Sequence, residues 1–276
     1  MPDAPLLDEA HIRLRRTRHG PMLYNVNDTY IGRSLDRYGE YVEAELALIG
    51  QLVRPGSVVV DAGANIGTHT VFLAKAVGPQ GAVFSFEPQR LVFQMLAANI
   101  ALNALTNVRA YWAAAGREPG TIIAPIADPT AEQNFGGMEL GGFATGDLVP
   151  VMTIDSFNLP VCHLIKIDVE GMELDVVEGA AATIARYRPV LFVENDRDSP
   201  RLIERLFSMD YRLYWHTAPM VHDDNYFGLL ENIFGEPVFT VNMIGVPRES
   251  RRKINGLIEV DSVDDTWEKF FARVEV

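Results

Sequence analysis

The sequence predicts a doubly wound α/β fold, in which helices cover both faces of a largely parallel sheet. Two observations predict it. Short apolar, β-branched runs alternate with helical segments from residue 57 onward, and runs such as 57–60 suit strands buried on both sides. Strands joined by crossover helices pair in parallel. Ligands of such sheets bind at the carboxyl ends of the strands, which directs attention to the residues after each strand.

The elements follow in a regular order after a mixed, turn-rich segment at 1–40. A helix is expected at 41–52, where Val42, Leu46 and Ile49 share one face. Further helices are expected at 67–77, 88–102, 173–187 and 200–209. Strands are expected at 57–60, 82–86, 108–113, 162–167, 190–193, 211–215 and 238–246.

Two parts are expected along the chain. Residues 1–52 form an N-terminal extension that packs on the core, and residues 53–276 form one catalytic domain. The catalytic domain carries an insert around 116–150, where many glycines and scattered apolar residues predict loops or a β-hairpin.

Charge and composition narrow the class of partner. The chain has 24 Lys and Arg against 37 Asp and Glu, a net charge of −13, which disfavours nucleic acid and leaves a small-molecule acceptor as the expected partner. No apolar run approaches the roughly 18–20 residues that span a bilayer, so membrane insertion is not expected. The N-terminus lacks the apolar core of a secretory signal. The single cysteine, Cys162, excludes an intrachain disulfide, and a cytoplasmic location is expected. The oligomeric state is not indicated.

The run VVVDAGANIGTHT, residues 58–70, is the strongest signal in the chain. It places an acid at the end of a strand, then Gly63 and Gly67, then the start of a helix. Glycines permit a tight turn with close ligand approach, and the first N–H groups of a helix attract a carboxylate or phosphate. The D-x-G-x-x-x-G spacing differs from the G-x-G-x-x-G of nicotinamide enzymes. Asp61 beside these glycines suits a cationic group such as the amine of an amino acid.

A second acid follows the next strand. Glu87 ends the run Phe84–Glu87, and a carboxylate there can accept hydrogen bonds from both hydroxyls of a ribose. Together, Asp61 and Glu87 indicate a ligand with a ribose and a charged amino-acid tail. S-adenosylmethionine has that composition, and it is the expected cofactor.

Four blocks of this sequence resemble the FkbM-type methyltransferases: DAGANIG (61–67), FEP (86–88), KIDVEGMELDVVEGA (166–180) and RPVLFVEN (188–195). The resemblance covers roughly 38–194 and takes in NFGG at 134–137 and NIF at 232–234. It implies a class I, Rossmann-like, S-adenosylmethionine-dependent enzyme with a seven-stranded sheet whose last strand is antiparallel. Many members of that family methylate hydroxyls of sugars or polyketide-like natural products.

The resemblance also implies which residues line the cofactor. The glycine turn and the acid after the second strand would surround it, and Ala113 and Ala114 would lie near the adenine. The expected cofactor residues are Asp61, Gly63, Asn65, Gly67, His69, Thr70, Glu87, Pro88, Ala113 and Ala114.

Methyl transfer to a hydroxyl needs alignment of donor and acceptor, and a general base or a metal ion that lowers the pKa of the alcohol. Candidate catalytic residues follow the fourth strand, at Lys166, Asp168 and Glu170, and His216 follows the strand at 211–215. Asn134, Asn225 and Asn232 are candidate substrate residues.

A divalent cation is a further expectation. Asp168 with the pair Glu194-Asn195 resembles the magnesium site of catechol-type O-methyltransferases, and hard oxygen ligands suit Mg²⁺. The alternative is that these acids accept hydrogen bonds from loop N–H groups and from Lys166.

Other functions remain open at this point. The acceptor atom could be nitrogen, and the chain could bind S-adenosylmethionine without catalysis. A nicotinamide-dependent oxidoreductase has to explain the different glycine spacing and the second acidic position.

Overall fold

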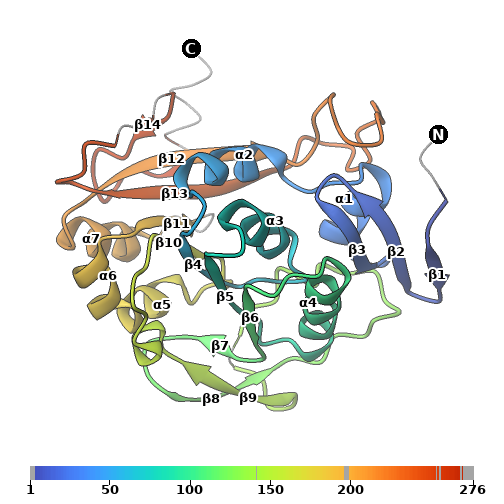
Figure 1. The fold of residues 1–276 in the computed structure, drawn as a ribbon, viewed down its shortest axis with the longest axis horizontal. Coiled ribbons are helices and arrows are strands. Elements are labelled where there is room, and N and C mark those ends of the chain that lie inside the picture. The colour runs from blue at the N-terminus through green and yellow to red at the C-terminus, as the bar shows by residue number, and fades with distance from the viewer. Residues whose placement is uncertain are drawn as a thin grey trace.

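A central sheet of eight strands organises the computed structural model, which describes residues 4–140, 142–195, 199–252, 254, 256–267 and 269 (Figure 1). Within these residues the spatial order is β14-β12-β13-β11-β10-β4-β5-β6. The strands are β4 (Val58–Ala62), β5 (Ala82–Phe86), β6 (Val108–Tyr111), β10 (Leu164–Ile167), β11 (Val190–Glu194), β12 (Tyr211–Pro219), β13 (Phe239–Pro247) and β14 (Ile258–Glu259).

The topology confirms the predicted doubly wound, mostly parallel sheet. The five strands from β6 to β11 pair in parallel, and β13 runs antiparallel between β11 and β12. The seventh long strand in sequence is therefore the antiparallel one, as expected. The two-residue β14, which pairs with β12, is an addition that the sequence did not suggest.

The chain reverses its direction of travel across the sheet between β4 and β10. It moves outward from β4 to β6 and then returns to β10 on the other side of β4. The register sets Asp61 of β4 level with Lys166 of β10 and Ser85 of β5. This is the switch point at which doubly wound sheets bind their ligands.

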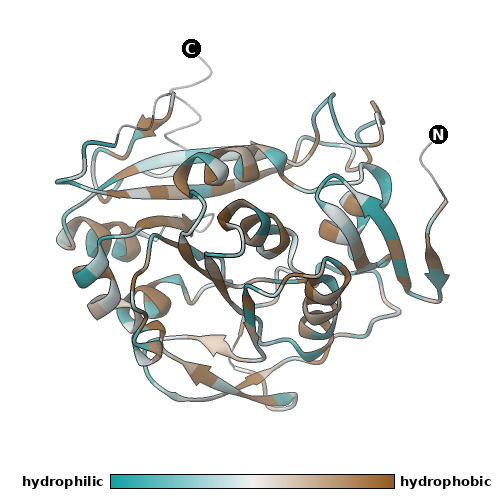
Figure 2. Cartoon of the chain, viewed as in Figure 1, coloured by the Kyte–Doolittle hydropathy of each residue, from teal (hydrophilic) through white to brown (hydrophobic). Residues whose placement is uncertain are grey.

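Alternate residues of each strand enter two separate apolar layers, because successive side chains point to opposite faces of a sheet. Val59 and Val83 pack under α2 (Glu43–Leu52) and α3 (Thr68–Val77). Val58 and Val60 belong to the layer on the opposite face. That face is covered by α5 (Glu173–Gly179), α6 (Ala181–Tyr187) and α7 (Pro200–Ser208). Figure 2 shows the resulting concentration of hydrophobic residues along the central strands.

One predicted helix, 173–187, is divided into α5 and α6 at Ala180. A side chain from outside both helices caps the start of α6. Asp155, in the short 3₁₀ helix η1 (Ile154–Phe157), accepts hydrogen bonds from the N–H groups of Ala182 and Thr183 at 2.9 and 2.7 Å. These contacts satisfy the first donors of a new helix.

The N-terminal extension is more ordered than its turn-rich composition predicted. It forms an antiparallel sheet of β1 (Leu7–Glu9), β2 (Ile12–Thr17) and β3 (Gly20–Asn25), followed by α1 (Ile31–Arg37). Asn99 of α4 (Arg90–Leu102) joins this sheet to the core. Its amide exchanges hydrogen bonds with the backbone of Leu23 and donates to the carbonyl of Ile66.

The insert contains the predicted hairpin. Strands β8 (Gly120–Ala124) and β9 (Asp147–Met152) pair antiparallel, and β9 also pairs with β7 (Ala114–Ala115). In Figure 1 this small sheet lies at the bottom, apart from β12 and β13. Among the described residues, we find no helix with the length and hydropathy to cross a bilayer.

Gly63 and Gly56 offer a matched test of how tightly the turn after β4 is packed. Both have positive φ, +79° and +86°, but a Cβ at Gly63 would lie 1.6 Å from the carbonyl oxygen of Asp168, whereas one at Gly56 meets nothing within 4 Å. We expect Gly56→Ala to lose about 1–2 kcal/mol of unfolding free energy from backbone conformation. Gly63→Ala should lose a further ~1–3 kcal/mol or more from overpacking. Urea denaturation measures both, and equal losses would contradict the packing argument.

Candidate functional site

The turn after β4 is held open by left-handed residues. Gly63, Asn65 and Gly67 have φ of +79°, +50° and +94°. The N–H groups of Gly63 and Ala64 donate to the carbonyl of Phe86 at 3.0 and 2.9 Å, which fixes the turn against β5. The segment that the sequence singled out therefore forms a hydrogen-bonded loop at the carboxyl end of β4, in the middle of the sheet.

Glu87 lies directly beyond β5, with its side chain pinned from two sides. Its Oε2 accepts from the N–H of Asn65 at 3.0 Å, and its Oε1 accepts from the N–H of Gln89 at 2.7 Å. Burial raises the pKa of Glu87 to about 7, although both hydrogen bonds act to lower it. Each carboxylate oxygen keeps a lone pair for a ligand.

Lys166 is a buried cation between two acids. Its Nζ lies 3.1 Å from Oδ2 of Asp168 and 3.5 Å from Oδ1 of Asp61. Burial acts to lower the pKa of Lys166, but the charges of Asp168 and Asp61 outweigh it, so the pKa is raised. For Asp168, burial acts to raise the pKa, and the charge and hydrogen bond of Lys166 bring it below its usual value. Both groups are therefore charged at neutral pH.

These groups border one cavity of about 270 Å³ at the carboxyl ends of the strands. The glycine turn, Glu87 and the Lys166–Asp168 pair form one side of it. Its lining residues are Tyr30, Ile31, Tyr41, Glu45, Gly63, Ala64, Asn65, Thr68, His69, Glu87, Asn134, Gly136, Gly137, Lys166, Asp168, Glu170, Glu194, Met220, Val238, Phe239, Thr240, Val241 and Asn242. Nine of the predicted site residues are in this set: Gly63, Asn65, His69, Glu87, Asn134, Lys166, Asp168, Glu170 and Glu194.

A smaller cavity adjoins the first and shares five lining residues with it: Gly63, Glu87, Gly136, Asp168 and Glu170. Its other walls are mostly apolar. They comprise Phe86, Pro88, Gln89, Ala114, Ala115, Met138, Leu140 and Val169, which include the predicted Pro88 and Ala114.

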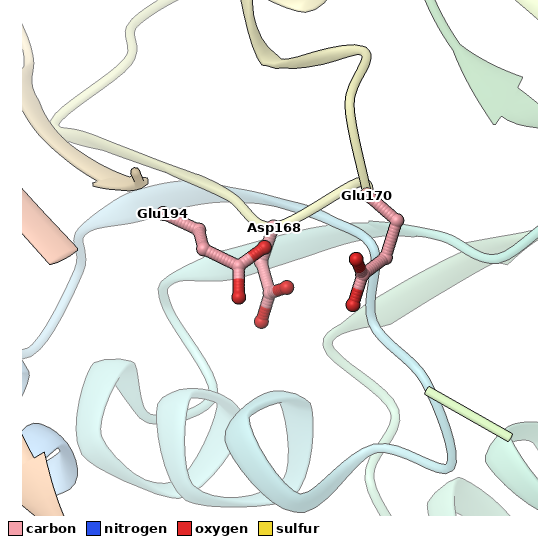
Figure 3. Close-up of side chains that lie close together, drawn as sticks. All are labelled: Asp168, Glu170 and Glu194. Carbon is pink, nitrogen blue, oxygen red and sulfur yellow. The ribbon is translucent and has the colours of Figure 1, made fainter. Parts of the chain in front are cut away.

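Three acidic side chains lie close together at the carboxyl ends of β10 and β11 (Figure 3). Carboxylate oxygens of Asp168, Glu170 and Glu194 lie within 4.8 Å of one another. The predicted third ligand, Asn195, does not join them. Its Oδ1 accepts from the N–H of Ser199 at 2.8 Å and its Nδ2 faces Sδ of Met243, so the amide belongs to the loop that leads into α7.

Asp61, a predicted cofactor residue, does not line either cavity. Its side chain is fully buried: Thr70 donates to its Oδ2 at 2.6 Å, and Lys166 lies beside its Oδ1. Of the two acids beside Lys166, Asp168 is the one that lines the cavity, and its side chain is 38% exposed.

Three more predicted cofactor residues shape the site from outside the cavity. Thr70 is occupied by Asp61 and Ser85, Gly67 begins α3 with Leu96 packed against it, and Ala113 lies in the apolar core. None of them lines either cavity.

Three predicted catalytic or substrate residues also lie elsewhere. His216 is buried against the ring of Phe192, outside both cavities, and burial lowers its pKa. The amide of Asn225 bonds the backbone of His222 and Leu229, and Asn232 bonds the backbone of Phe234 and Glu236. Both asparagines close loop turns, which is the common use of this residue in loops.

Five residues that form the far wall of the cavity were not predicted from the sequence. Tyr30, Tyr41 and Glu45 come from the N-terminal part of the chain, and Thr240 and Asn242 come from β13. Glu45 lies within a helix predicted only from its apolar face. No local pattern links it to residues nearly 200 positions away, since only the folded sheet brings α2 and β13 together.

Comparison with known proteins finds matches among methyltransferases. The model of the Methyltransferase FkbM domain matches residues 61–213. Methyltransferase 1 of Beauveria bassiana (strain ARSEF 2860) is 30% identical over 145 residues, which cover 45% of this chain and 58% of that protein. Methyltransferase sdnD of Sordaria araneosa is 28% identical over 155 residues, 44% of this chain and 59% of that protein. The chain thus matches somewhat more than half the length of these curated relatives.

Among solved structures, the crystal structure of Methyltransferase FkbM from Methylobacillus flagellatus KT superposes with a TM-score of 0.48 at 20% identity, covering 75% of this chain and 48% of that one. The family model spans more than half of the chain and includes the glycine turn, Glu87 and the Lys166–Asp168 pair. The chain belongs to the FkbM methyltransferase family.

Proposed function

We propose that the chain transfers the methyl group of S-adenosylmethionine to a hydroxyl of a small molecule, such as a sugar or a natural product. The observation that carries the proposal is the cavity itself. It joins the ribose-type acid Glu87 and the glycine turn to the charged pair Lys166–Asp168 at the switch point of the sheet. Membership of the FkbM family supports the same reaction class.

In this proposal the cofactor extends across both cavities. Glu87 accepts hydrogen bonds from the ribose hydroxyls, and the apolar walls at Pro88, Ala114 and Val169 surround the adenine. Asp168 stands beside the positively charged sulfonium and amine, in the place first expected for Asp61. Lys166 holds this carboxylate in its ionised form.

The rest of the larger cavity has the composition of a site for a polyhydroxylated acceptor. Tyr30, Tyr41 and Phe239 offer aromatic surface, and Asn134 and Glu194 offer polar groups within the same walls. Small-molecule sites combine an apolar lining with a few polar groups that fix orientation. Bringing the hydroxyl and the methyl carbon together in this space is the main task of the protein in a one-step displacement.

The direct test is incubation with methyl-labelled S-adenosylmethionine and a panel of sugars, polyols, phenols and amines, with mass spectrometry for products heavier by 14 Da. Label in a hydroxyl compound supports the proposal. Label only in amines would show an N-methyltransferase. Binding of S-adenosylhomocysteine without any product would indicate a non-catalytic binding protein.

Glu87 makes cofactor affinity depend on pH. Its pKa is raised to about 7, so below that pH the carboxyl gains a proton and loses its strength as an acceptor for ribose hydroxyls. Calorimetric titration with S-adenosylhomocysteine should therefore show affinity falling as the pH drops from 8 to 6, approaching roughly tenfold per unit.

Glu87→Gln is the matched control because it keeps the shape and removes the titration. It should bind about tenfold or more weakly at pH 8, where a charged acceptor is lost, and should lose most of the pH dependence. Unchanged affinity and an unchanged profile in this variant would show that Glu87 does not contact the ribose.

The metal ligands predicted from the sequence, Asp168, Glu194 and Asn195, do not fit a cation, because Oδ1 of Asn195 already accepts a hydrogen bond from the N–H of Ser199. Asp168, Glu170 and Glu194 do offer three close oxygens, but Asp168 already has the ammonium of Lys166 at 3.1 Å. We therefore propose that Lys166 supplies the positive charge and that methyl transfer proceeds without a bound divalent ion.

Calorimetric titration of EDTA-treated protein with Mg²⁺, Mn²⁺ and Ca²⁺ tests this proposal. We expect no saturable heat with a dissociation constant below about 1 mM, which corresponds to a binding free energy of about 4 kcal/mol. Tighter binding that disappears in Asp168→Asn would restore the metal hypothesis, with Glu170 in place of Asn195.

A further inference from the structure

The proposed reaction leaves one chemical task unassigned, the removal of the proton from the acceptor hydroxyl. Asp168 is poorly suited to it, because Lys166 holds its pKa below the usual value and so weakens it as a base. A second carboxylate lies across the same cavity and is linked to an imidazole. These two residues are Glu45 of α2 and His69 of α3.

Glu45 is a buried anion held by three neighbours. Nε2 of His69 lies 2.9 Å from its Oε2, Nδ2 of Asn242 donates to its Oε1 at 2.8 Å, and the hydroxyl of Thr240 donates to the same oxygen. Burial acts to raise the pKa of Glu45, but the hydrogen bonds of His69 and Thr240 and the charge of His69 when it is protonated outweigh burial and keep the pKa below its usual value. The carboxylate is therefore ionised and fixed in direction.

An ionised Glu45 determines which nitrogen of His69 carries the proton. A carboxylate only accepts hydrogen bonds, so Nε2 of His69 is the N–H donor in this pair. Whenever the ring is neutral, its lone pair is therefore on Nδ1, which has no partner among the residues that the structure describes. A carboxylate that orients an imidazole in this way also stabilises the imidazolium form once a proton arrives.

Both members of the pair line the cavity, and His69 follows the glycine turn in sequence. The wall around the pair, formed by Tyr41, Glu45 and the β13 residues 239–242, lies outside the segment that matches the family model. The titratable groups that face the pair across the cavity are Tyr41, Glu87, Lys166, Asp168, Glu170 and Glu194. Asp168 and His69 are close enough for the charge of one to affect the other.

The geometry points to His69 as the general base of the methyl transfer, with Glu45 as its positioning residue; this inference rests on the proposed function. Nδ1 of His69 takes the proton of the acceptor O–H as an oxygen lone pair attacks the methyl carbon. The S–CH₃ bond breaks and its electron pair returns to sulfur. The products are a methyl ether, neutral S-adenosylhomocysteine and a protonated His69, which later releases its proton to water.

A first test needs no acceptor. Nitrogen-15 spectra of the histidine rings, with His69 assigned by its loss in His69→Gln, should show an N–H at Nε2 and a bare Nδ1 at pH 7.5. The pattern should persist with S-adenosylhomocysteine bound. A proton on Nδ1, or a bound cofactor that hydrogen-bonds Nδ1, would overturn the assignment.

Binding and turnover then separate this inference from the proposed function. His69→Gln should bind S-adenosylhomocysteine within about threefold of wild type, and with an acceptor found in the screen its kcat should fall by about 10²–10⁴. A loss of cofactor affinity above tenfold would instead place His69 in the cofactor site. If wild-type protein fails to bind S-adenosylhomocysteine, the proposed function fails; if it methylates and His69→Gln is equally fast, only the base assignment fails.

The chain offers a matched control on the same helix. Glu43 of α2 pairs with His19 at 2.8 Å, outside the cavity, so His19→Gln should leave kcat unchanged. Glu45→Gln should lower kcat and move the acid limb of the kcat/KM profile to lower pH, since the imidazolium loses its carboxylate. A purely structural role for Glu45 would lower the melting temperature and kcat without moving that limb.

Discussion

The site depends on the two ion pairs that the buried ammonium of Lys166 makes with Asp61 and Asp168. The ammonium lies between Asp61 of β4 and Asp168 after β10, the two strands at which the sheet changes direction. Removing one partner from a buried pair typically costs about 3–5 kcal/mol, because the remaining charge is left in a poorly solvated place. The ion pairs of Lys166 with Asp61 and Asp168 thus connect the strand before the glycine turn to the loop that carries Asp168 and Glu170.

The fold was predictable because its signals are local and repeated. Alternation of apolar strands with amphipathic helices gave the central strands to within a few residues, and Ala82–Phe86 agrees in full. The break at Ala180 was not predictable, since it depends on Asp155 reaching a helix 27 positions away. The N-terminal sheet was missed for a related reason. Its strands pack against α1 and α4, and local patterns do not report such contacts between distant elements.

The site was predictable in part, along the strand ends. Glu87, Gly63 and Asp168 were found because each directly follows a strand, and parallel strands end on the same side. The direction of a side chain was harder to predict than its position. Asp61 ends a strand and nevertheless points inward to Thr70 and Lys166, and Asn195 turns back to Ser199. The pairing of Glu45 with His69 depends on the packing of α2 against α3, and no spacing in the sequence encodes it.

The far wall of the cavity has a consequence for how the protein folds. Glu45 meets Thr240 and Asn242 across 195 and 197 positions of chain. Contacts of such long range form late, after nearer strands have paired, because closing a long loop is entropically costly. In a chain made from its N-terminus, the glycine turn, Glu87 and the Lys166–Asp168 pair are synthesised before Thr240 and Asn242, so the wall that Glu45 shares with β13 is the last part of the cavity to become available.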